Sequence, residues 1–191
     1  ILIAARLRSL YPALREPEHT LDRLDFVLLF LLLAAFAPLY LGFVYTVPPQ
    51  ASSDEIVVTS LAERLSEVPL PDVFGLAGHF DFPALSFIVV GWIARLFGGV
   101  DFFHARLAHA SLGLVVIGLS FMLFRTYATR FVAVGAACIL GLSHSLIGIS
   151  RLAMREDTAV IALLLALFFL FRGYERESRS QQFLGGLFGG L

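Results

Sequence analysis

The sequence predicts an all-α integral membrane protein, a multi-span helical bundle with membrane-parallel amphipathic helices in its first extracytoplasmic loop. Hydrophobic residues make up 58% of the 191 residues and mean hydropathy is +0.84, against roughly 45–50% apolar residues in ordinary soluble domains. The uncharged run Phe26–Val47 is by itself long enough to cross the hydrocarbon core of a bilayer. The net charge of −1 gives no reason to expect nucleic acid as a partner, and the single Cys138 excludes an intrachain disulfide.

The first span is expected at Phe26–Val47, after a cytoplasmic N-terminal segment made of residues 1–25. The positive-inside rule places this segment in the cytoplasm because it carries Arg6, Arg8, Arg15 and Arg23. We expect Pro48 and Pro49 to stop the helix, since proline has no N–H donor and clashes with the preceding turn.

Further apolar runs follow at Ala84–Val100, Leu107–Phe124, Phe131–Ile149 and Thr158–Phe171, and Phe183 opens another. If every run crossed the membrane, the arginine-rich loops 125–130 and 172–179 would lie outside, against the positive-inside rule. The weakest span is Ala84–Val100, which follows Pro83 and contains Arg95. We therefore predict that Ala84–Val100 stays on the outer side as an interfacial or re-entrant helix; a segment of this kind can lie in the interface plane, with its arginine reaching the head groups.

This topology makes 48–106 the first extracytoplasmic loop of a transmembrane domain that covers residues 26–191. A helix is predicted from Asp54 to Val68, with Ser52 at the N-cap and Glu55 at N3 of a capping box. Its apolar face is expected to comprise Val57, Leu61, Leu65 and Val68, at helical spacing. The pattern indicates an amphipathic helix that lies on the membrane.

The acidic pair Asp54-Glu55 stands just outside the first span and has two interpretations. Carboxylates in the first turn of a helix are favoured by capping and by the helix dipole. The same carboxylates would serve as a general base, because partial desolvation at the interface raises a carboxyl pKa. Local pattern alone leaves both open.

Other polar residues gather at the same predicted boundary. Arg106 begins the span Leu107–Phe124, where a guanidinium either reaches the head groups or grips a lipid phosphate. The loop with Arg151, Glu156 and Asp157 is either ordinary boundary charge or a second acidic site. His79 and Asp81 form a weak metal-ligand pattern. We assign no function to His104, His109 and His144, which we expect to be satisfied by helix neighbours or interfacial water.

The order of these parts resembles the GT-C superfamily of membrane glycosyltransferases, in particular the protein O-mannosyltransferase and aminoarabinose transferase branch. An Asp-Glu motif follows the first span, here Asp54-Glu55. His79-Phe80-Asp81-Phe82-Pro83 is similar to a short His-Pro-Pro or Tyr-x-x-Pro motif. The run from Arg106 to Gly113 matches Arg-Leu-x-x-Ala-x-x-Gly, and Ser150-Arg151 precedes Glu156 where the family usually has Asp. The resemblance covers about residues 26–175.

The resemblance implies transfer of a sugar from a polyprenyl-phosphate donor to an acceptor on the extracytoplasmic face, by direct inverting displacement. Asp54 is then expected to be the catalytic base, with Glu55 as its partner or an acceptor-orienting group. The substrate-binding candidates are Arg106 and Arg151 for the phosphate, Glu156 and Asp157 for the sugar or acceptor, and His79 and Asp81 in the short motif. Which of Glu156 and Asp157 acts stays open.

The implied partners are the lipid-linked donor, a protein, lipid or glycan acceptor, and membrane lipids, at the plasma membrane. No cofactor is demanded; a divalent metal ion is left open, since some relatives use one. The chain begins without Met and ends in an apolar run, so we expect an N-terminal fragment that is incomplete at its C-terminus. The alternative is a non-enzymatic polytopic membrane protein, a transporter or an assembly subunit. Transporters usually place charges near the midplane, whereas these spans are nearly free of charge.

Overall fold

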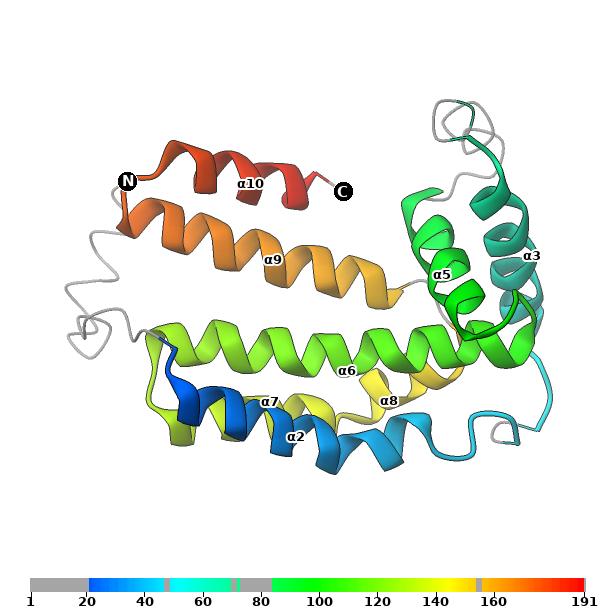
Figure 1. Ribbon diagram of the computed structural model, residues 1–191, viewed down its shortest axis with the longest axis horizontal. Helices are drawn as coiled ribbons and strands as arrows, with labels where there is room; N and C mark the ends of the chain where they lie inside the picture. The colour runs from blue at the N-terminus through cyan, green and yellow to red at the C-terminus, as the bar shows by residue number, and fades with distance from the viewer. Residues whose placement is uncertain (1–20, 47–48, 70–71, 73–83, 154–155, 191) are drawn as a thin grey trace.

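The computed structural model describes residues 21–46, 49–69, 72, 84–153 and 156–190, and this part of the chain is helical without strands. Its eight helices, shown in Figure 1, are α2 (Arg23–Leu41), α3 (Ser53–Glu67), α5 (Ala84–Phe97), α6 (Phe102–Tyr127), α7 (Arg130–Gly141), α8 (His144–Arg151), α9 (Glu156–Glu175) and α10 (Arg179–Gly189). The predicted all-α membrane fold is confirmed.

Three helices, α2, α6 and α9, are long and apolar enough to cross a membrane. The expected span Phe131–Ile149 is instead two helices, α7 and α8, which are bent by 56° at a short break and count as a fourth span only if taken together. The long helix α6 runs through the middle of the bundle, between α9 on one side and α2 with α7 on the other (Figure 1). These helices share a core that includes Phe36, Ile117 and Phe121.

The bounds of α2 differ from those expected. The helix begins at Arg23, where Asp22 and Asp25 form a capping box, and it ends at Leu41, well before the prolines that were predicted to stop it. Gly42 is the C-cap: its N–H donates to the Pro38 carbonyl at 3.0 Å, as in the helix, while its own backbone is extended. Arg151 of α8 donates to the carbonyls of Leu39 and Gly42 at 2.8 and 2.9 Å, so a tertiary contact satisfies carbonyl groups at this helix end.

Helices α3 and α5 pack side by side across one end of the bundle, and α5 runs transverse to α6 (Figure 1). With its 14 residues, α5 is shorter than the three candidate spans, in agreement with a membrane-parallel helix. Gly91 permits the close approach, because a Cβ there would overlap the Ala62 carbonyl oxygen and the side chain of Ser66. Arg95 donates to Glu67 at 2.7 Å, so it binds α3 across this contact.

The apolar face of α3 follows the predicted stripe at Leu61, Leu65 and Val68 and departs from it at Val57. Val58, Leu61, Ala62 and Leu65 are buried in the core shared with α5 and α6. Val57, which we expected on this face, is 44% exposed. The prediction was wrong here because the rotation of α3 is set by what it packs against, as well as by its own spacing.

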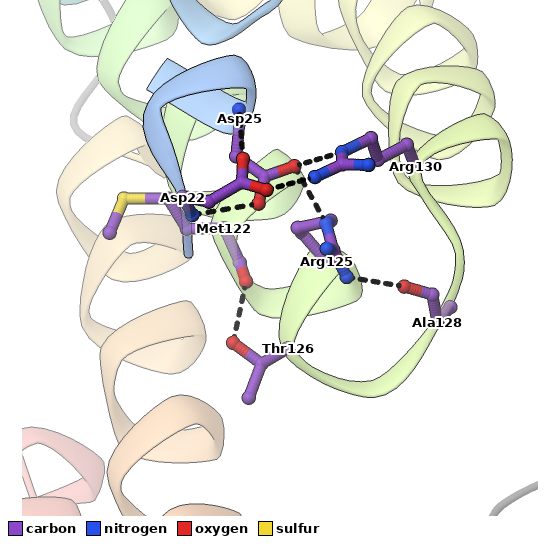
Figure 2. A network of polar contacts seen from close by, with 7 residues as sticks. All are labelled: Asp22, Asp25, Met122, Arg125, Thr126, Ala128 and Arg130. Carbon is purple, nitrogen blue, oxygen red and sulfur yellow. Dashed lines mark hydrogen bonds and ion pairs between the residues drawn. The ribbon is translucent and has the colours of Figure 1, made fainter. Parts of the chain in front are cut away.

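At the opposite end of the bundle, a charged cluster joins the start of α2 to the end of α6 and the start of α7 (Figure 2). Asp25 is 1% exposed and accepts hydrogen bonds from Arg125 Nε and Arg130 Nε, both at 2.8 Å. Arg130 also pairs with Asp22. The N–H of Asp25, and to a lesser degree Arg130, hold the pKa of Asp22 below its usual value. The cluster fixes three helix ends where the basic residues gather.

Candidate functional site

The first candidate residue, Asp54, lies on the surface in the first turn of α3. Among the residues that the structure describes, its carboxylate has no hydrogen-bond or ion-pair partner. The predicted capping box is confirmed, and Glu55 is the member of the acidic pair that closes it: Ser52 Oγ accepts from the N–H of Glu55 at 3.2 Å, and Glu55 accepts from the N–H of Ser52 at 2.8 Å. Asp54 is therefore not needed as a cap.

Its neighbour Glu55 is fully buried and forms a bidentate ion pair with Arg106 of α6. Arg106 Nε donates to Oε1 at 2.7 Å and Nη2 donates to Oε2 at 3.0 Å. This fork-to-fork geometry is the strongest that arginine makes with a carboxylate. Because Glu55 also closes the capping box, it ties the start of α3 to α6.

Arg106 reaches beyond this carboxylate to the chain between α2 and α3. Its Nη2 donates to the Gln50 carbonyl at 3.2 Å and its Nη1 to the Val44 carbonyl at 3.4 Å. Arg106 also borders a cavity of about 260 Å³, whose other lining residues are Tyr45, Pro49, Ala51, Phe102 and Phe103. Arg106, which is 5% exposed, thus forms one wall of a cavity whose other walls include aromatic side chains.

The second acidic motif separates into a buried and an exposed carboxylate. Asp157 is fully buried; it accepts from Ser150 Oγ at 3.1 Å, and its Oδ2 lies 3.2 Å from His109 Nδ1. Glu156 is exposed and borders a second cavity of about 260 Å³, between α5 and α9. The rest of its lining is Leu85, Ser86, Val89, Leu112, Thr158, Ala159, Ile161, Ala162, Leu165 and Phe188.

The polar groups at this second cavity come from two helices. Ser86 of α5 and Thr158 of α9 are joined by a 2.6 Å hydrogen bond between their hydroxyls, and Glu156 lies two residues before Thr158. A carboxylate and two hydroxyls offer both acceptors and donors, the set that sugar hydroxyl groups need. The remainder of the lining is largely apolar.

The structure brings most of the predicted site residues to one end of the bundle. The N-termini of α6 and α9 and the C-terminus of α8 meet there with α3 (Figure 1). Arg151 lies at this end too, bonded to the last turn of α2. His79 and Asp81 lie outside the described residues. Within the described ranges, no group of three or more His, Cys, Asp or Glu residues is arranged to hold a metal ion.

Sequence reasoning missed three contributors: His109, Ser150 and the Ser86–Thr158 pair. His109 carried one signal, because it follows Arg106 by three residues and so lies one turn deeper on a similar face of α6. Ser150 stood in the Ser150-Arg151 motif without an assigned contact, and Ser86 carried no signal, since the partners of both lie on other helices. Gly113, the last residue of the Arg-Leu-x-x-Ala-x-x-Gly run, now has a physical reason: a Cβ there would overlap Ser150 and the Tyr40 ring.

Comparison with known proteins identifies the family to which these motifs belong. Residues 74–191, more than half of the chain, match the family model described as dolichyl-phosphate-mannose-protein mannosyltransferase. No curated protein and no solved structure matches the chain. The matched range holds Arg106, Arg151 and the second acidic motif, while the first acidic motif precedes it. The predicted GT-C resemblance is confirmed: this chain belongs to the dolichyl-phosphate-mannose-protein mannosyltransferase family, glycosyltransferases that use a polyprenyl-phosphate-linked sugar donor.

Proposed function

We propose that the protein transfers a mannosyl group from a polyprenyl-phosphate donor to a protein acceptor, at the extracytoplasmic face, by inverting displacement with a carboxylate base. The distribution of charge supports an extracytoplasmic location of the site. The cluster with Arg125 and Arg130 lies at the end of the bundle opposite the acidic site, and the positive-inside rule assigns that basic end to the cytoplasm. The carboxylates then face outward.

One observation carries the assignment of the base. Of the two adjacent carboxylates, Glu55 is buried against Arg106, whereas Asp54 is exposed and has no partner among the described residues. A general base must reach the acceptor hydroxyl within hydrogen-bonding distance and accept its proton. Asp54 is available for that contact, and Glu55 holds the turn that presents it.

The other groups fit the remaining parts of the reaction. Glu156, beside the hydroxyls of Ser86 and Thr158, is proposed to bind sugar or acceptor hydroxyls. The adjacent Asp157 is buried and bonded to Ser150, and we propose that it holds this turn of α9 in place. Positive charge must stabilise the departing lipid phosphate, and we propose Arg106 and Arg151 for it. A phosphate that entered the cavity lined by Tyr45 and Phe103 would contact the guanidinium of Arg106.

The test is Asp54→Asn in the full-length protein, assayed in membranes with polyprenyl-phosphate mannose and an acceptor peptide. Ser52 and Glu55 keep the cap, so the variant is expected to fold normally while turnover falls by at least about 10²-fold, the usual scale for a positioned base. Donor binding should be largely retained, because the base acts on the acceptor. Glu63→Gln, an exposed carboxylate on the same helix, is the control and should keep full turnover. Near-normal turnover of Asp54→Asn would remove it from catalysis.

A further inference from the structure

A buried polar cluster made of His109, Ser150 and Asp157 lies just inside the candidate site, and His109 and Ser150 have no function assigned above. The three side chains come from α6, α8 and α9, and none is exposed. His109 follows Arg106 by three residues, a rise of about 4.5 Å along α6. His109 therefore lies about one turn further along α6 than Arg106.

The hydrogen bonds of the cluster converge on one carboxylate. Ser150 Oγ donates to Oδ1 of Asp157, and His109 Nδ1 faces Oδ2 at 3.2 Å. An ionised carboxylate only accepts, so this contact selects the tautomer in which Nδ1 carries the proton. The other ring nitrogen, Nε2, is buried and has no hydrogen-bond partner among the residues that the structure describes. The imidazole is thus committed to Asp157 alone, at the cost of one unsatisfied buried atom.

The anchored carboxylate fixes the start of α9. Glu156 and Thr158 flank Asp157 in the first turn of that helix, and both line the cavity against α5. Successive helical residues point about 100° apart, so holding Asp157 inward sets the directions of both neighbours. The 2.6 Å hydrogen bond between Thr158 and Ser86 depends on that rotation.

We propose that His109 is a positioning residue: by donating to Asp157 it fixes the rotation and height of the first turn of α9, and so holds Glu156 and the Ser86–Thr158 pair at the cavity that binds the sugar. The inference about α9 rests on the geometry alone, and its consequence for sugar binding rests on the function proposed above.

The geometric part is tested without an activity measurement. Ser86→Cys and Thr158→Cys are introduced together into the full-length protein, with Cys138 and any other native cysteine replaced by serine. Since the two hydroxyl oxygens lie 2.6 Å apart, a mild oxidant added to membranes should form a disulfide between the two introduced cysteines. Adding His109→Leu should lower the initial rate of linking at least about fivefold, whereas His109→Asn keeps a donor for Asp157 and should restore most of it. Ile117→Ala, a cavity-forming change two turns away on α6, is the control for general loosening and should leave the rate unchanged.

The functional part uses mannosyl transfer by the same variants without the added cysteines. We expect His109→Leu to raise the donor KM about tenfold and His109→Asn to stay within about threefold of the parent. Equal linking rates in His109→Leu and the parent would overturn the proposal, as would a defect in His109→Asn as large as that in His109→Leu. An Ile117→Ala rate reduced as far as that of His109→Leu would overturn it too, since loosening alone would explain the effect. A parent protein without transferase activity, together with the expected linking rates, would refute the proposed function and leave the positioning of α9 standing.

Discussion

Neutralising Glu55 should destabilise the fold far more than neutralising an exposed acid on the same helix. In Glu55→Gln the guanidinium of Arg106, 5% exposed, loses its counter-charge while keeping the carbonyls of Val44 and Gln50. Breaking a buried ion pair from one side costs about 3–5 kcal/mol. Because Gln keeps the shape and one acceptor oxygen, we expect the lower end, about 3 kcal/mol, or roughly two orders of magnitude in the folding equilibrium.

The assay is thermal unfolding of the full-length protein in detergent, followed by the loss of the monodisperse species. For a unit of this size, 3 kcal/mol corresponds to a fall in Tm of about 6–12 °C. The matched control is Glu67→Gln on α3, which breaks an ion pair with Arg95 whose side chains are 40% and 65% exposed. Exposed pairs contribute about 0–1 kcal/mol, so this Tm should fall by less than about 3 °C.

A double variant separates pairing from packing. Glu55→Gln with Arg106→Met removes both charges, so its loss of stability should be smaller than the sum of the single losses by about 1–3 kcal/mol. Strictly additive losses, or a Glu55→Gln protein as stable as Glu67→Gln, would show that the buried pair does not hold α3 to α6.

Two further outcomes follow from the packing of α6. Asp25→Asn removes the carboxylate that pairs with both Arg125 and Arg130, so the free energy of unfolding should fall by about 3 kcal/mol. The control Asp22→Asn changes an exposed carboxylate and should cost less than about 1 kcal/mol. Equal Tm values for the two variants would contradict the role of the cluster. Gly113→Ala places a methyl group against Ser150 and Tyr40, which should lower the free energy of unfolding by about 1–3 kcal/mol. In the control Gly135→Ala, on α7, the methyl group meets open space and stability should not change. The melting curves of the two variants in detergent test both expectations.

The sequence by itself determined the features that depend on neighbouring residues. Long apolar runs identified the spans at α2, α6 and α9, because the bilayer thickness sets the length that an apolar helix needs. The capping box of Ser52 and Glu55 could be read directly, since its partners stand three residues apart. The transverse helix at Ala84 was expected from its short length, its arginine and the charges that flank the other runs.

The tertiary structure decided which side chains meet across helices. Glu55 and Arg106 are 51 positions apart, and only the docking of α3 on α6 revealed that Glu55 is engaged while Asp54 stays exposed. The same packing rotated α3 so that Val58 rather than Val57 is buried, and it placed Arg151 at the carbonyl end of α2, which ends at Leu41, before Pro48. It also gathered His109, Ser150 and Asp157 from three helices. These contacts depend on the rotation of each helix about its axis and on its position along that axis. Packing of the whole bundle sets both, so a local sequence pattern does not predict them.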